Sequence, residues 1–232
     1  MDHLRRSLVV TAALALLALA PSTSLAGDAS RSPTDTTPGL SLDARRTAVL
    51  VMDFQNDIID MLPSNGREPL LEHAASLVAA ARQSGLPVVY VVVRFRDGYP
   101  EVVAGSRFAF LKQTGLLREG APGAEIHARV APKPGDVVVT KRRVGAFSTT
   151  DLETVLRAKN VDTLVLAGIS TSGVVLSTVR WAADMDYKLA VVSDACADTD
   201  PEVHRVLTQK VFPMQATVVS TTDAVQAITR LK

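Results

Sequence analysis

Apolar residues follow one another along this chain in short and nearly continuous runs. Six runs are rich in valine and other β-branched residues. Unbroken runs of this kind are typical of strands that are covered on both faces, as in a parallel sheet. Strands are therefore predicted over residues 47–52, 87–93, 136–140, 163–167, 188–192 and 216–220.

Between these runs, apolar residues recur at the three- and four-residue spacing of amphipathic helices. This pattern predicts helices over residues 68–84, 152–159 and 172–185, another that begins at Pro201, and a last one that ends near Arg230. Strands that alternate with helices predict an α/β domain of three layers, α/β/α.

Residues 94–134 interrupt this alternation. The segment contains five glycines and four aromatic side chains but no long periodic stretch. A loop of this length inside a compact domain is more often a lid or a pocket wall than a plain connection. We therefore expect it to border a binding site.

The N-terminus has the pattern of a secretory signal. Arg5 and Arg6 precede an apolar stretch over 7–20, and the small-residue site Ser24-Leu25-Ala26 follows. An uncleaved membrane anchor is the alternative, but it needs about 18–20 apolar residues. We predict a signal peptide over 1–26, a flexible linker over 27–43 and one domain over 44–232, in a secreted or periplasmic protein.

Composition narrows the functional classes. The net charge is +1 without a basic block, so nucleic acid is not an expected partner. A single cysteine, Cys196, excludes an internal disulfide framework. The four histidines lack metal-ligand spacing, and neither a metal nor another cofactor is predicted. After signal cleavage, no membrane association is expected.

Two charged residues stand where predicted strands end. Asp53 follows the first strand, and partial burial there would raise its pKa and suit it to proton transfer. Its alternative role is a helix cap or a turn residue. Lys141 follows the third strand and could pair with Asp53, although a solvated lysine beside Arg142 and Arg143 is the alternative.

The turn after the fourth strand, over 168–175, is the third candidate element. Free backbone N–H groups near Gly173 and Val174 could form an oxyanion hole, although any strand-to-helix turn has this appearance. Hydroxyl groups are present at 170–172, but no histidine is close in sequence to activate one. Cys196 is expected to be a small buried hydrophobic residue.

Three segments together resemble the isochorismatase-like (cysteine hydrolase) superfamily. They read VLVMDFQND around Asp53, TKRRVGAF around Lys141, and LVLAGISTSGVVLSTVRWAADMDYKLAVVSDACA, and the resemblance covers about residues 45–220. It implies a three-layer, Rossmann-like fold with a six-stranded parallel sheet, assembled as homo-dimers or homo-tetramers. Most members hydrolyse C–N bonds of small molecules with an Asp–Lys–Cys triad, in which Asp53 matches the acid/base and Lys141 the lysine.

One position of this chain departs from the family pattern. The family turn reads G-x-x-T-x-x-C-V, so Gly168 and Thr171 match while Val174 stands at the cysteine position. Valine cannot attack a carbonyl carbon. The isochorismatases proper also lack this cysteine, typically with glycine there, and cleave a vinyl ether with the aspartate as general acid. The resemblance further implies that the Ile169–Ser170 peptide bond is cis.

Nicotinamidase-type members bind a metal after the second strand, but RFRDGYPEV lacks those ligands. We therefore expect a metal-free hydrolase that acts on the vinyl ether or C–N bond of a small molecule, without a covalent intermediate. The alternatives are an inactive relative that binds a small molecule or a protein, and a displaced nucleophile at Cys196. The expected site residues are Asp53 and Lys141 for catalysis, Ser170, Gly173 and Val174 for oxyanion binding, and Gln55, Arg94, Phe95 and Phe147 for substrate binding.

Overall fold

The computed structural model describes residues 40–231. The predicted signal peptide and the predicted linker up to residue 39 lie outside the described residues. Leu40 and Leu42 are partly buried and pack against the core, so the packed chain begins before the predicted boundary at residue 44. Among residues 40–231, the helices are too short or too polar to cross a membrane.

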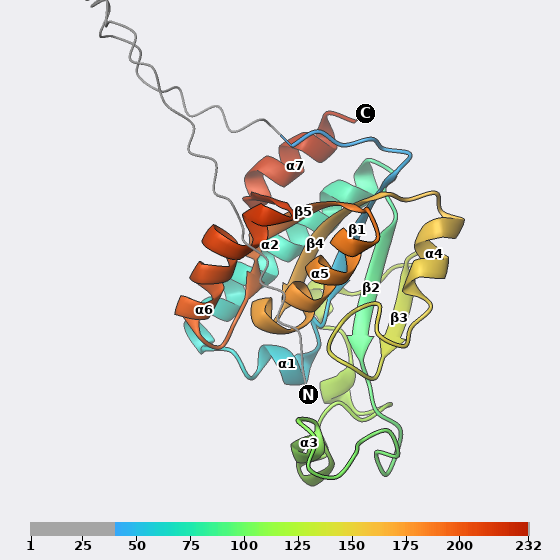
Figure 1. The fold of residues 1–232 in the computed structure, drawn as a ribbon, viewed down its shortest axis with the longest axis vertical. Coiled ribbons are helices and arrows are strands. Elements are labelled where there is room, and N and C mark those ends of the chain that lie inside the picture. The colour runs from blue at the N-terminus through green and yellow to red at the C-terminus, as the bar shows by residue number, and fades with distance from the viewer. Residues whose placement is uncertain (1–39, 232) are drawn as a thin grey trace, which may run out of the picture. The chain divides into compact units, whose positions relative to one another are not determined.

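A six-stranded sheet forms the centre of the domain, and all of its neighbouring strands are parallel. The order is β3-β2-β1-β4-β5-β6 (Figure 1). The strands are β1 (Thr47–Met52), β2 (Val88–Val93), β3 (Val137–Lys141), β4 (Thr163–Ile169), β5 (Lys188–Ala197) and β6 (Thr217–Val219). The strand order reverses between β1 and β4, and the crevice outside the carboxyl ends of such strands is where α/β sheets bind ligands.

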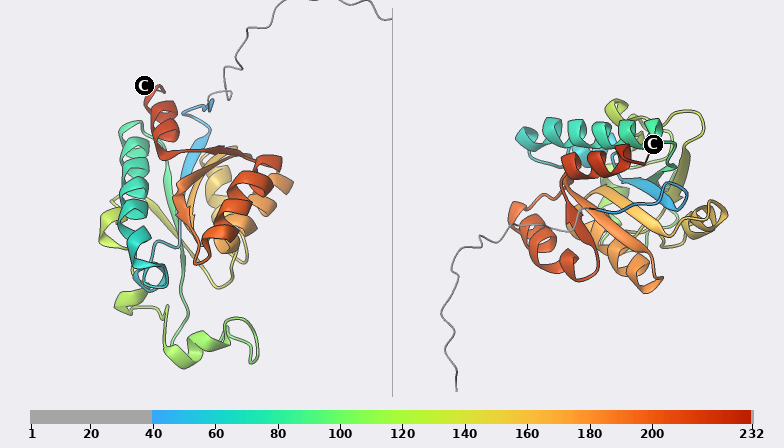
Figure 2. Two further views of the ribbon diagram at one scale, coloured as in Figure 1. Left: turned by 90° about the vertical axis from the view of Figure 1, so that its left-hand side faces the viewer. Right: turned by 90° about the horizontal axis from the view of Figure 1, so that it is seen from above.

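Helices cover both faces of the sheet, which confirms the predicted three layers (Figure 2). The helices α2 (Ser64–Gln83) and α7 (Thr221–Thr229) bury their apolar residues on one face. The helices α4 (Leu152–Ala158), α5 (Leu176–Asp184) and α6 (Pro201–Val206) lie on the other face. The valine-rich strands therefore contribute alternate side chains to two separate cores.

Two short helices were not predicted, and both lie at the carboxyl end of the sheet (Figure 1). They are α1 (Asn56–Ile59), directly after β1, and α3 (Ala109–Thr114), within the insertion over 94–134. The helix predicted over 172–185 begins instead as a π-helical turn, Thr171–Val175, and continues as α5. These departures from the simple pattern gather where the candidate site lies.

Candidate active site

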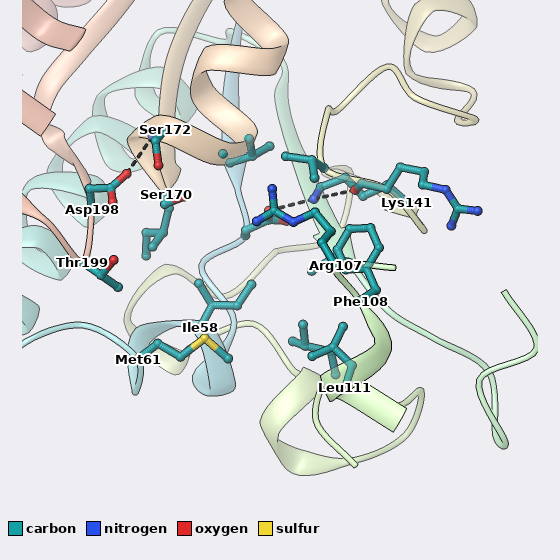
Figure 3. A pocket seen from close by; sticks show the side chains of 18 of the residues that line it. Ile58, Met61, Arg107, Phe108, Leu111, Lys141, Ser170, Ser172, Asp198 and Thr199 are labelled. Atoms are coloured by element: carbon teal, nitrogen blue, oxygen red, sulfur yellow. Dashed lines mark hydrogen bonds and ion pairs between the residues drawn. The ribbon is translucent and has the colours of Figure 1, made fainter. Parts of the chain in front are cut away.

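A pocket of about 290 Å³ opens at the carboxyl ends of β1 and β4 (Figure 3). Asp53, Lys141, Ser170, Gly173 and Val174 all line it, so the fold brings together five residues that the sequence singled out. They come from three segments that are far apart in the chain, after β1, at the end of β3 and after β4. The parallel sheet places these strand ends along one edge.

Asp53 is fixed at the end of β1 by an unusual backbone conformation. Its φ is +61°, in the left-handed region that aspartate and asparagine tolerate better than most residues. Its amide donates to the carbonyl of Val91 at 2.8 Å, which holds the turn against β2. The residue is only 4% exposed, and its Oδ1 has no hydrogen-bond partner among the described residues. One carboxyl oxygen is therefore left free in a buried position beside the pocket.

Lys141 supplies the counter-charge. Its Nζ donates to Asp53 Oδ2 at 2.8 Å and to the carbonyl of Arg143 at 3.1 Å, and its side chain is 2% exposed. The strand β2 separates β1 from β3, so this ion pair joins two strands that are not neighbours in the sheet. Burial raises the pKa of the Asp53 carboxyl, and the charge and hydrogen bond of Lys141 oppose that rise without cancelling it. Such a carboxyl group suits proton transfer.

Backbone hydrogen bonds hold the turn after β4 in place. The Ile169–Ser170 peptide bond is cis, as the resemblance implied. The amide of Ser172 donates to Asp198 Oδ2 at 2.7 Å, and the amide of Gly173 donates to the carbonyl of Ser170 at 3.1 Å. The Gly173 amide is therefore engaged within the turn, which corrects the expectation that it is free to bind an oxyanion.

Gly173 has a steric role in the same turn. A Cβ atom at this position would lie 2.6 Å from Ser170 Oγ, well inside van der Waals contact. A larger residue at this position would therefore displace the Ser170 hydroxyl group. Val174 follows at 2% exposure, and its side chain lines the pocket at the position expected for a nucleophile.

Four residues expected from position alone do not line the pocket. Gln55 is fully buried, where its Nε2 donates to the carbonyls of Val93 and Ala124 and its Oε1 accepts from the Val93 amide. Arg94 turns to the surface and pairs with Glu125 at 3.0 Å. Both side chains hold the chain around β2 in place. Gln55 and Arg94 were predicted to contact substrate, but in the structure their contacts are structural.

The aromatic pair is corrected in the same way. Phe95 is fully buried and packs with the rings of Tyr99 and Phe108 in a small cluster beneath the pocket. Phe147 lies in the core on the α5 face, where its ring stacks on Trp181 with 6.5 Å between centroids. Each ring supports an element near the site without lining it.

The insertion over 94–134 forms one wall of the pocket, as its length and composition predicted. Most of the lining residues that the sequence analysis missed fall into three groups: Arg107, Phe108, Phe110, Leu111 and Leu117 from the insertion, Ile58, Met61 and Leu62 from and after α1, and Asp198 and Thr199 after β5. The glycines and aromatic residues of the insertion were the available signal for the first group. Within residues 40–231, no group of three or more histidine, cysteine or acidic side chains is arranged to hold a metal ion.

Cys196 lies in the core beneath the site rather than in the pocket. Its side chain is buried, its Sγ lies 3.9 Å from the carbonyl oxygen of Leu166, and burial raises the pKa of its thiol to about 12. Only the thiolate is a good nucleophile. We expect iodoacetamide to leave Cys196 unlabelled in the folded protein at neutral pH and to label it fully in urea, as measured by mass spectrometry.

The control for the labelling experiment is an activity measurement on a cysteine variant. Cys196→Ala should keep kcat unchanged, because the thiol does not reach the pocket. Rapid labelling of the native protein together with loss of turnover would instead identify Cys196 as a displaced nucleophile.

Comparison with known proteins adds a family to this geometry. A model described as the isochorismatase domain matches residues 47–223. The chain is 32% identical over 195 residues to an uncharacterized isochorismatase family protein, YecD, of Escherichia coli O157:H7, covering 82% of this chain and 100% of that protein. It is 31% identical over 193 residues to the maleamate amidohydrolase of Pseudomonas putida, covering 81% of this chain and 89% of that enzyme.

A solved structure shows the same fold. The cysteine hydrolase from Pseudomonas syringae pv. phaseolicola 1448A superimposes with a TM-score of 0.75 at 26% sequence identity. The match covers 85% of this chain and 100% of that one. The similarity therefore extends over most of this chain.

Proposed function

The chain belongs to the isochorismatase family of hydrolases, and from this premise we propose that it hydrolyses a small molecule by proton transfer at Asp53, without a covalent enzyme intermediate. The observation that carries the proposal is the Asp53 carboxyl group. It lines the pocket, is buried, is paired with Lys141 at 2.8 Å through one oxygen, and has no hydrogen-bond partner among the described residues at the other.

The side chains at the turn support a mechanism without a protein nucleophile. Val174 has no atom that can attack a carbonyl carbon. The fold brings one histidine to the turn, His204, whose Nδ1 lies 2.8 Å from Thr171 Oγ1. Thr171 is fully buried and is not among the residues that line the pocket, so this hydroxyl is not positioned to attack a substrate.

Two reactions suit a single acid/base carboxyl group. In vinyl-ether cleavage, Asp53 donates a proton to the terminal carbon of the double bond. Water then adds to the ether carbon, and the C–O bond breaks to give a ketone and an alcohol. In C–N hydrolysis, Asp53 takes a proton from the attacking water and returns it to the leaving nitrogen. Lys141 keeps the carboxyl group oriented in either case.

The proposal is tested by assays of both bond types. We expect turnover of isochorismate, measured by the release of pyruvate, or of maleamate, measured by the release of ammonia. The activity should be insensitive to iodoacetamide, because no step uses a thiolate. Thiol-dependent turnover would contradict the mechanism even if the substrate were correct.

A second function, binding without catalysis, is favoured by one observation. Val174 lines the pocket at the position expected for the nucleophile, and its side chain is bulkier than the glycine that the resemblance implies for the isochorismatases proper. A thermal-shift screen of small molecules separates the two functions when the ligands are also tested for turnover. Tight binding with no turnover of any ligand would favour the inactive relative.

We also propose that the protein is exported and self-associates. The arginine-led apolar stretch that ends at Ser24-Leu25-Ala26 supports export to the periplasm or the medium. The resemblance to a family of dimers and tetramers supports a homo-oligomer. N-terminal sequencing of the exported protein should begin at Gly27, and light scattering should give a multiple of the monomer mass.

A further inference from the structure

Arg142 joins the insertion to the end of β3. It directly follows Lys141, where a basic turn open to solvent was the alternative prediction. Its side chain is instead only 18% exposed. Its Nη1 donates to the carbonyl of Arg94, its Nη2 donates to Glu119 Oε1, and its Nε donates to Glu101 Oε1 at 3.2 Å. One guanidinium group therefore contacts the insertion at three separate points.

Two of these contacts lie at the neck of a loop, where the insertion leaves β2 and later returns to it. Phe95 lies at the start of this loop, and its amide donates to the carbonyl of Leu117 at 2.9 Å. The amide of Glu119 donates back to the carbonyl of Phe95 at 2.8 Å. The segment between these residues includes α3, which lies beyond the carboxyl end of the sheet (Figure 1), and it forms the insertion wall of the pocket. Arg142 therefore holds the neck of the loop that builds this wall.

The third contact, at Glu101, lies inside the loop and is an ion pair. The side chain of Glu101 is 12% exposed and also accepts a hydrogen bond from Arg96. Burial alone would raise the pKa of this carboxyl group, but hydrogen bonds from its own backbone, Arg96 and Arg142 hold the pKa below its usual value. Glu101 is thus kept as a carboxylate that faces the guanidinium group.

The same strand end carries one member of the buried ion pair. Lys141 immediately precedes Arg142, and its Nζ contacts Asp53 Oδ2 at 2.8 Å. The carbonyl of Lys141 accepts a hydrogen bond from the amide of Arg94 at 3.2 Å. A guanidinium group has five N–H donors in a rigid plane, so it can contact several acceptors at once, whereas an ammonium group is a single point charge. Arg142 therefore links the position of the wall to that of the ion pair.

We propose that Arg142 is a positioning residue that holds the insertion wall in place relative to the Asp53–Lys141 pair. Arg142 is not among the residues that line the pocket, so it acts through the insertion rather than by contact with substrate. The inference rests on the proposed function, because the substrate held against this wall is the one that Asp53 acts on. The amide of Leu117 also donates to Asp57 Oδ2 at 2.7 Å, so loss of Arg142 loosens the neck without detaching the wall.

The first test measures amide hydrogen exchange by NMR in the exported, full-length domain. In Arg142→Gln, the neck amides of Phe95 and Glu119 should exchange about tenfold faster, because hydrogen bonds to charged groups that oppose opening of the neck are lost. The amide of Asp53, which donates to the carbonyl of Val91 at 2.8 Å, should exchange as slowly as in the wild type. This measurement needs no substrate, so it does not depend on hydrolysis.

The second test separates positioning from a general loss of stability by steady-state kinetics. With whichever of isochorismate and maleamate is turned over, Arg142→Gln should raise KM about tenfold and change kcat much less, because the wall contributes binding and the Asp53–Lys141 pair stays on the sheet. A purely structural role would reduce the amount of folded enzyme, which lowers the apparent kcat and leaves KM unchanged.

Arg118→Gln is the matched control. Arg118 belongs to the same insertion and pairs with Asp97 at 3.1 Å, but both side chains are exposed and neither lines the pocket. This variant should leave both neck exchange and KM unchanged. Glu119→Gln removes the charge of one contact at a side chain that is 43% exposed, so it keeps the fold even if Arg142→Gln does not. It should change exchange and KM in the same direction by a smaller factor.

The outcomes separate this inference from the proposed function. Unchanged exchange at the neck, or an unchanged KM in folded Arg142→Gln, would overturn the inference while leaving the observed hydrolysis intact. Faster neck exchange in a protein that turns over no substrate would support the role of Arg142 in holding the wall and count against the hydrolase.

Discussion

Replacing Asp53 with asparagine is expected to lower kcat by about 10²–10⁴-fold, the usual contribution of a positioned general acid or base. Asparagine keeps the size of the side chain and tolerates the left-handed backbone at φ +61°, so the turn after β1 should persist. The amide cannot deliver or accept the proton that the carboxyl group transfers.

The pH profile gives a second measurement of the same residue. Burial raises the pKa of Asp53, so the carboxyl group keeps its proton to a higher pH than an exposed aspartate does. If Asp53 acts as the general acid, kcat should be retained on the acid side and fall as pH rises through that pKa. If it acts as the general base, kcat should rise with pH instead. The direction therefore distinguishes vinyl-ether cleavage from C–N hydrolysis.

Asp60→Asn is the control for both measurements. Asp60 follows α1, its side chain is 73% exposed, and it pairs with Arg67 outside the pocket. This variant should match the wild type in kcat and in pH profile. Full activity in Asp53→Asn would show that the proton moves elsewhere.

Replacing Lys141 with methionine is expected to lower the free energy of unfolding by about 3–5 kcal/mol at neutral pH, as for other buried ion pairs that lose one partner. Methionine fills most of the volume of the lysine stem, so the loss is mainly electrostatic. The carboxylate of Asp53 would remain 4% exposed with no counter-charge. Urea unfolding followed by circular dichroism gives the free energy directly.

The loss of stability in Lys141→Met should depend on pH in a defined direction. Removing Lys141 removes the main influence that lowers the pKa of Asp53, so that pKa rises further in the folded state. The native state then binds a proton that the unfolded state releases. The stability of the variant should be fully present below the unfolded pKa of about 3.9 and be lost as pH rises through the folded value.

The double variant Asp53→Asn with Lys141→Met separates charge from packing. With both charges absent, most of the stability should return, because neither group is left buried and ionised. A packing defect would be indicated instead if Lys141→Met lost the same stability at every pH. It would also be indicated if the loss of stability persisted in the double variant.

Strand ends were predictable because unbroken valine runs stop where the sheet stops. Asp53 and Lys141 each follow such a run, and parallel strands place their carboxyl ends at one edge, so their meeting followed from the pattern. The turn over 168–175 was recognisable for the same reason. The strand β5 runs five residues past its predicted end, and Asp198 lies just beyond that extension, so its contact with Ser172 was missed.

Residues near a strand end were harder to place. Successive side chains of a strand point to opposite sides, so Val93 can line the pocket while Arg94 turns to the surface. Proximity in sequence therefore misassigned Arg94. The place of Arg107 in the pocket lining depends on the path of the insertion, which has no periodic sequence pattern that would predict it.

The placement of the pocket residues has a consequence for how this enzyme could diversify. The Asp53–Lys141 pair lies at the ends of β1 and β3, whereas Arg107 and the aromatic wall belong to one contiguous insertion between β2 and β3. A graft of the corresponding segment from a relative would exchange this wall of the pocket in one step and leave the Asp53 carboxyl group in place on the sheet. This wall of the pocket and the Asp53 side of the ion pair are thus encoded by different stretches of the gene.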